Sequence, residues 1–156
     1  ITPLTLEVLS QRPVSTDLFG GHESHVVHTR LAEQANLVLI APATANVIGK
    51  LANGIADDLL TCLVLATRAP RLLAPAMNVQ MYNHPVVQDN MRTLRRLGFR
   101  FVGPAVGSLV CGYEAIGHLA EVDEIVNVAL QLAAPGRNPL SAPPSRPSRR
   151  IAKRRK

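Results

Sequence analysis

The sequence predicts an α/β domain in which a parallel sheet is covered by helices on both faces. Residues 37–40 (Leu-Val-Leu-Ile) form an unbroken apolar run, which is typical of a strand buried on both sides in a parallel sheet. Strand-like apolar segments then alternate along the chain with segments of helical periodicity, a pattern that favours a three-layer sheet of Rossmann or flavodoxin-like type. The 156 residues suit one domain of this kind.

The apolar run is expected to be the central strand and to carry a functional turn at its end. Residues 41–43 (Ala-Pro-Ala) should end the strand, because Pro42 has no N–H to donate to a neighbouring strand. Thr44 and Asn46 are good helix-starting residues, and a helical pattern follows through Leu51. In open α/β sheets ligands lie where such a strand ends and its helix begins, and the free N–H groups there favour anionic or polar ligand atoms.

Other elements are expected on both sides of this run. Periodicity, helix-starting residues and the glycine at position 98 predict helices over residues 4–9, 24–35, 57–66, 85–97 and 122–132. Short apolar runs predict strands over residues 72–74 and 99–102. The usual first strand of a doubly wound fold and its glycine-rich phosphate loop are not recognised in the sequence.

The positive charge is concentrated in the last 20 residues. Eight of the 17 Lys and Arg residues lie from Arg137 onward, so the first 136 residues hold 9 basic and 11 acidic residues. Residues 134–156 are rich in Pro, Ser, Arg and Lys, which predicts a disordered tail or linker after a domain over residues 1–133. The tail has no interleaved aromatic residues, so we expect no nucleic-acid partner.

Other classes of protein are disfavoured by composition. The apolar runs are too short to span a membrane, and the first residues show no signal-peptide pattern. Two cysteines are too few for a disulfide framework, which favours a cytoplasmic protein with reduced thiols. His25 and His28 form an HxxH pair without an evident third ligand, so no metal site is expected.

Three residues outside the turn could do chemistry, and each also has a purely structural interpretation. His28 could exchange a proton near neutral pH, or it could be a surface helix histidine. Asn78 follows a strand and could orient a carboxylate, or it could be a turn residue. Cys111 lies in a glycine-rich stretch (Gly107, Gly112 and Gly117) that could form a mobile flap, or it could be a small core residue, as Cys62 is expected to be.

Four motifs in order resemble the flavin-dependent cysteine decarboxylases over residues 1–132. They are PATAN from Pro42, GKLANGIADDLLT from Gly49, PAMN from Pro75 and LVCGYEAIGHLAE from Leu109. The resemblance is closest to the branch that acts on 4′-phosphopantothenoylcysteine. It implies FMN-dependent decarboxylation of this small molecule to 4′-phosphopantetheine in coenzyme A biosynthesis.

The resemblance also implies roles for particular residues. His28 would be the catalytic base, and Cys111 the proton donor to an enethiol intermediate. Asn78 would contact the substrate carboxylate beside Met77 and Ala76. The flavin would contact the turn formed by Thr44, Ala45, Asn46 and Val47. Two positions depart from the family pattern, since Ala115 replaces a glycine and His118 replaces an arginine, so we expect weaker substrate binding.

The resemblance extends to partners and to competing functions. It implies a homotrimer or a dodecamer with active sites at subunit contacts, and a phosphopantothenate–cysteine ligase that is fused or separate. It also implies an N-terminally truncated copy, in which restoring an upstream glycine-loop segment should strengthen FMN binding. The alternatives are a lantibiotic-type peptidyl-cysteine decarboxylase, a non-catalytic flavoprotein-like subunit, and an incomplete product without stable flavin.

Overall fold

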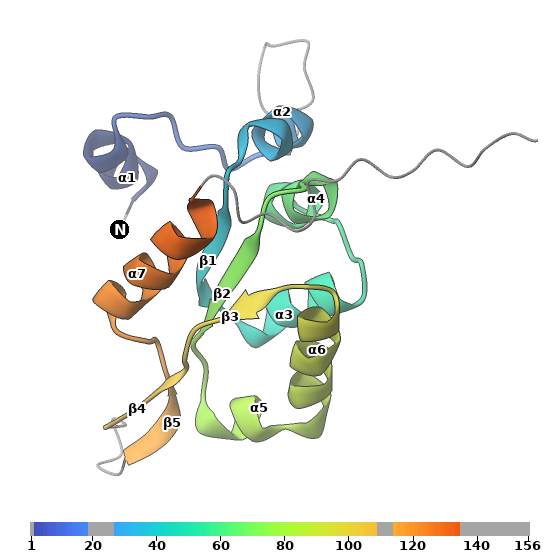
Figure 1. Cartoon of the computed structure of the whole chain (residues 1–156), viewed down its shortest axis with the longest axis vertical. Coiled ribbons are helices and arrows are strands. Elements are labelled where there is room, and N and C mark those ends of the chain that lie inside the picture. Colours follow the sequence, from blue (N-terminus) through green and yellow to red (C-terminus); the bar gives the residue numbers. More distant parts are fainter. Residues whose placement is uncertain (1, 19–26, 109–113, 135–156) are drawn as a thin grey trace, which may run out of the picture.

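A computed structural model of the chain describes residues 2–18, 27–108 and 114–134. It confirms a parallel sheet with helices on both faces (Figure 1). Strands β1 (Val38–Ala43), β2 (Arg71–Pro75) and β3 (Arg100–Phe101) are parallel and lie in the order β1-β2-β3. The predicted strands over residues 72–74 and 99–102 correspond to β2 and β3.

Two apolar clusters hold the sheet between its helix layers. On one face, α3 (Ala45–Ala52), α4 (Leu59–Ala66) and α6 (Pro85–Arg96) pack against β1 and Leu73 of β2. On the other face, α7 (Val122–Ala133) inserts Ile125 against Leu72 and Ala74. Successive residues of β2 therefore point to opposite helix layers, as the pleat of a strand requires.

The prediction that residues 37–40 form the central strand, covered on both faces, is wrong in part. Among the described strands β2 is the middle one and β1 lies at the edge. Val38 and Ile40 are buried, but the side chain of Leu39 is 40% exposed. The reason is that α7 packs over β2 and leaves the Leu39 side of β1 uncovered by the described helices.

The strand ends at Ala43, within the stretch of residues 41–43 that was predicted to end it, although β1 includes Pro42. The pairing of β1 with β2 shifts register between Ile40 and Ala43, so Pro42 lies in an irregular part of an edge strand. An edge or a bulge is where a strand tolerates a residue without an N–H.

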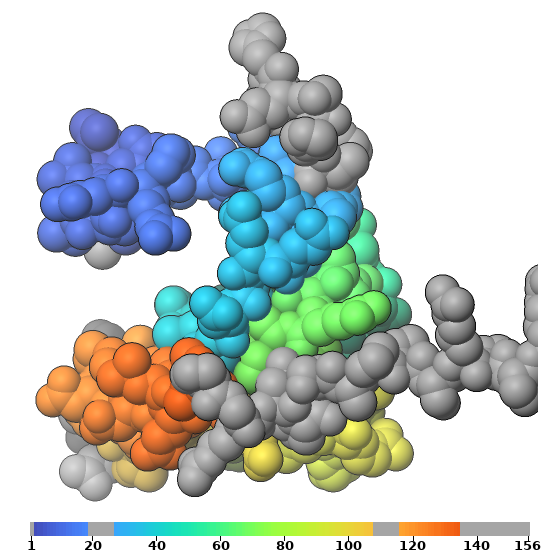
Figure 2. Space-filling view, turned by 45° about the horizontal axis from the view of Figure 1, so that its top comes forward, coloured from blue at the N-terminus to red at the C-terminus, as the bar shows by residue number. Residues whose placement is uncertain are grey.

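The predicted helices are present in the structure with small differences at their ends, and three further elements were not predicted. The segments expected over residues 4–9 and 24–35 form α1 (Pro3–Ser10) and α2 (Val27–Gln34). Helix α1 has no buried residue and stands off from the rest of the described surface (Figure 2). The sequence did not predict α5 (Val79–Asn83) or the hairpin of β4 (Ala105–Ser108) and β5 (Glu114–His118). None of the described helices has the length and apolar content to span a membrane.

Candidate functional site

The carboxyl ends of β1 and β2 bring two of the predicted site segments together. Ala43 pairs with Pro75, and the N–H of Ala76 donates a 3.2 Å hydrogen bond to the carbonyl of Ala43. The turn that begins at Thr44 therefore lies beside the turn that contains Met77 and Asn78. This is the edge of a parallel sheet where ligands are expected.

Thr44 begins α3 as its N-cap, as the sequence predicted. Its hydroxyl oxygen accepts from the N–H of Val47 at 3.4 Å, and its carbonyl accepts from the N–H of Ile48 at 3.0 Å. The N–H groups of Ala45 and Asn46 lie in the first turn, where a helix supplies no carbonyl partner. Thr44 and Asn46 are exposed, so this turn presents polar donors to a ligand at the sheet edge.

Asn78 has a structural task that the sequence indicated only as an alternative. Its side-chain oxygen accepts from the N–H of Gln80 at 2.8 Å and caps the five-residue helix α5. The side chain is exposed, and its NH₂ group is a donor that the cap does not use. Met77 is half-buried against the apolar cluster that includes Leu73. Asn78 is thus held in place while its amide faces solvent.

His28 lies away from these two turns within one chain. Helix α2 packs against α4, and the hydroxyl of Thr67 donates a 2.9 Å hydrogen bond to the carbonyl of Ala32. In Figure 1, α2 lies at the end of β1 opposite α5 and the β4–β5 hairpin. The side chain of His28 is half-buried, and its Nδ1 has no hydrogen-bond partner in the structure as described. The structure therefore does not bring His28 and Asn78 together within one chain.

The predicted flap is only partly described. Cys111, Gly112 and the rest of residues 109–113 lie outside the described residues. Gly107 and Gly117, which the sequence placed in the flap, belong to the paired strands β4 and β5. His118 ends β5, and its ring lies against Gly107. Cys62 is half-buried on α4 and its thiol donates to the carbonyl of Ala56 at 3.4 Å.

A charged cluster that the sequence analysis did not assign fixes the connection between α3 and α4. The ammonium of Lys50 lies 2.7 Å from Asp57 and 3.1 Å from Asp58. Hydrogen bonds to Asp57 and then Asp58 raise the pKa of Lys50 above its ordinary value. The backbone N–H of Thr61, with its hydroxyl and Lys50, holds the pKa of Asp58 below its ordinary value, against the effect of burial.

This cluster stabilises helix termini and is not a metal site. Asp58 and Thr61 form a reciprocal capping box at the start of α4. The signal was present in the sequence as an N-cap Asp followed three residues later by Thr. Within the described ranges, no group of three or more His, Cys, Asp or Glu side chains is arranged to hold a metal ion.

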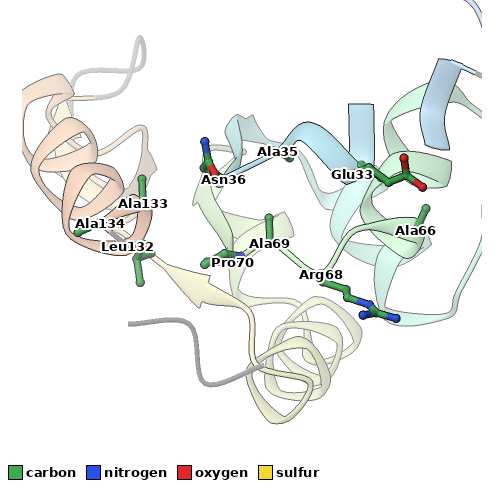
Figure 3. A pocket seen from close by; sticks show the side chains of 11 residues that line it. Glu33, Ala35, Asn36, Ala66, Arg68, Ala69, Pro70, Leu132, Ala133 and Ala134 are labelled. Atoms are coloured by element: carbon green, nitrogen blue, oxygen red, sulfur yellow. The ribbon is translucent and has the colours of Figure 1, made fainter. Parts of the chain in front are cut away.

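A cavity of about 790 Å³ lies at the opposite edge of the sheet, where the strands begin (Figure 3). It is bounded by the ends of α2, α4 and α7, and none of the predicted site residues lines it. Its wall is made mainly of alanines, with Glu33, Asn36 and Arg68 as the polar side chains. The candidate site is the carboxyl edge, because the two predicted turns adjoin there.

The fold and the two adjoining turns define a flavodoxin-like α/β protein with a binding edge at the carboxyl ends of β1 and β2. The profile of the Flavoprotein family matches residues 1–134. The chain belongs to this family.

Individual relatives are similar over most of the chain. The coenzyme A biosynthesis bifunctional protein CoaBC of Bacillus subtilis is 50% identical over 130 residues, which cover 83% of this chain and 32% of that protein. The probable phosphopantothenoylcysteine decarboxylase of Streptococcus mutans is 41% identical over 129 residues, covering 81% of this chain and 72% of that protein. The chain thus spans about a third of the length of the bifunctional relatives.

Solved structures of FMN-dependent cysteine decarboxylases are also similar to this chain. The crystal structure of the FMN-dependent cysteine decarboxylase SpaF matches with a TM-score of 0.72 and 35% identity, covering 86% of this chain and 73% of that chain.

Proposed function

We propose that this chain carries out the FMN-dependent decarboxylation of 4′-phosphopantothenoylcysteine to 4′-phosphopantetheine in coenzyme A biosynthesis. The observation that carries the proposal is the pairing of two polar turns at the carboxyl edge, joined by the hydrogen bond from Ala76 to Ala43. One turn offers donors to a cofactor, and the other offers the Asn78 amide to a carboxylate. The name of the S. mutans relative supports this substrate, and the name of the B. subtilis relative supports the pathway.

The residues of the first turn fit a flavin. Exposed Thr44 and Asn46 and the first N–H groups of α3 would hold the polar atoms of FMN, with Ala45 and Val47 completing the contact. Bound FMN would accept two electrons from the substrate thiol and return them after the carboxylate has left. Side chains of the protein would bind the substrate and transfer the protons.

Three side chains would carry those tasks. Asn78 would hold the substrate carboxylate beside Met77 and Ala76, because an amide can donate without adding charge. His28 would take up a proton before CO₂ is lost, and its Nδ1, which has no hydrogen-bond partner among the described residues, supports this use. Cys111 would return a proton afterwards, since a thiol is far more acidic than an alcohol.

The proposal includes an assembly and a location. Because α2 lies far from α5, a site completed by His28 of another copy fits the homotrimer or dodecamer implied by the family. A phosphopantothenate–cysteine ligase, fused or separate, would supply the substrate in the cytoplasm. We further propose that the domain comprises residues 1–133. Light scattering of the purified protein tests the assembly, and a monomer would contradict it.

A second candidate is the decarboxylation of a C-terminal peptidyl cysteine, favoured by the structural similarity to the peptidyl-cysteine decarboxylase EpiD. Release of CO₂ from 4′-phosphopantothenoylcysteine, from its dephosphorylated form and from a cysteine-terminated peptide separates the two candidates. The proposal expects the phosphorylated small molecule to react fastest. If the peptide reacted fastest, peptidyl-cysteine decarboxylation would become the favoured function.

A further inference from the structure

The three residues that follow β2 are each held by a different element. The N–H of Ala76 donates to Ala43 of β1, and the N–H of Met77 donates to the carbonyl of Gly117 in β5 at 2.9 Å. The side chain of Asn78 caps α5 through Gln80. The orientation of Asn78 is therefore set from three sides, and one of them is the β4–β5 hairpin.

The contact with the hairpin is possible only because residue 117 is glycine. Gly117 is buried and has a φ of +137°, a conformation that L side chains rarely adopt. A Cβ at this position would collide with the carbonyl oxygen of Met77, which is a backbone atom and has little freedom to move. The close approach of β5 to the turn thus requires the missing side chain.

We propose that Gly117 is a positioning residue, which docks the β4–β5 hairpin on the Met77–Asn78 turn and so orients Asn78 toward the substrate carboxylate. The role of Asn78 in this inference rests on the proposed function, whereas the contact between Gly117 and Met77 does not. A side chain at position 117 would move the turn or the hairpin, and shifts of about 1 Å in a binding group weaken its action strongly.

The effect should appear in substrate binding rather than in cofactor binding. Asn78 contacts a group that is present before the reaction begins, so misplacing it raises KM more than it lowers kcat. We expect Gly117→Ala to raise KM by about tenfold, a loss typical of one misplaced hydrogen bond to a charged group. FMN affinity should change less than about twofold, because the Thr44 turn belongs to α3 and not to the docked segment.

Two glycines serve as matched controls. Gly98 has a φ of +86° with no other atom within 4 Å of the position that a Cβ would take, so Gly98→Ala introduces backbone strain without a collision. Gly107 lies in the same hairpin, and its Cβ would be 3.0 Å from the ring of His118, so Gly107→Ala perturbs the hairpin without touching Met77.

The experiment measures amide hydrogen exchange at Met77 and steady-state kinetics with 4′-phosphopantothenoylcysteine for all three variants in the FMN-loaded protein. We expect loss of Met77 protection and the raised KM in Gly117→Ala alone. Retained protection, or lost protection with an unchanged KM, would overturn the inference. An inactive wild-type protein would instead overturn the proposed function and the role of Asn78, while hydrogen exchange still decides whether the contact exists.

Discussion

The hydroxyl of Thr67 donates a 2.9 Å hydrogen bond to the main-chain carbonyl of Ala32 and thereby joins the end of α4 to α2. The same oxygen accepts from the N–H of Ala69 at 3.1 Å. Thr67 is one of two buried polar residues in the described part of the chain. It holds the helix that carries His28 in a fixed relation to the sheet.

Replacing Thr67 with valine should lower the free energy of unfolding by about 1–3 kcal/mol. The variant keeps the volume but leaves the buried carbonyl of Ala32 and the N–H of Ala69 without this partner. Urea unfolding measures the loss. Thr67→Ser retains the hydroxyl and is the matched control, and a valine variant as stable as wild type would show that these hydrogen bonds contribute little.

Asp58 should contribute stability that depends on pH. Its pKa in the folded protein lies below the ordinary value of 3.8, so the folded state binds the proton more weakly than the unfolded chain. The contribution is therefore present above pH 3.8 and is lost as pH falls through the lower folded pKa. Asp58→Asn keeps an oxygen for Thr61 but removes the charge.

The measurement is urea unfolding of wild type and Asp58→Asn between about pH 2 and 7. We expect the wild-type advantage to shrink as pH falls below 3.8. A difference that stays constant over this range would contradict the assignment. Asp58→Ala also loses the N-cap, and it should cost about 1 kcal/mol at neutral pH.

Thr44 should affect both its helix and the cofactor. Thr44→Ala removes the N-cap of α3 and should lower stability by about 1 kcal/mol, and the proposal expects weaker FMN binding as well. Fluorescence titration of FMN measures the affinity. Thr44→Ser retains the cap as the control, and an unchanged affinity in Thr44→Ala would remove this turn from the cofactor site.

Several features of the fold and the site were predictable because their causes are local. Thr44 at the start of α3 is a capping signal, and Gly98 after α6 has the positive φ that a helix end favours. The edge position of β1 was not predictable, because Leu39 has the same apolar character as its buried neighbours. Strand order is decided by long-range packing, which an apolar run does not encode.

The site shows the same division. The adjacency of the Thr44 and Asn78 turns follows from parallel strands that end at one edge, which the sequence pattern indicated. The docking of Gly117 on Met77 joins residues 40 positions apart in the sequence, and no local periodicity signals it. The glycines around Cys111 suggest a flexible flap when only the sequence is considered. In the structure, Gly117 instead allows β5 to approach the main chain of Met77 closely.

Deleting residues 138–156 should leave thermal unfolding and FMN affinity unchanged. The segment lacks an apolar face and carries only positive charge, so it has little to bury. Calorimetry of the full and shortened chains measures the effect. A clear fall in the unfolding temperature of the shortened chain would contradict this prediction.

The central claim is tested most directly by single-turnover mixing of FMN-loaded protein with 4′-phosphopantothenoylcysteine, with CO₂ and flavin absorbance followed together. Cys111→Ser should release CO₂ without recovery of flavin absorbance, because a hydroxyl is a much weaker acid than a thiol with a pKa of about 8.5. His28→Asn should release no CO₂. Cys62→Ser and His84→Asn, at a half-buried cysteine and an exposed helix cap, are the matched controls and should behave as wild type. Wild-type protein that binds FMN but leaves this substrate unchanged would contradict the account.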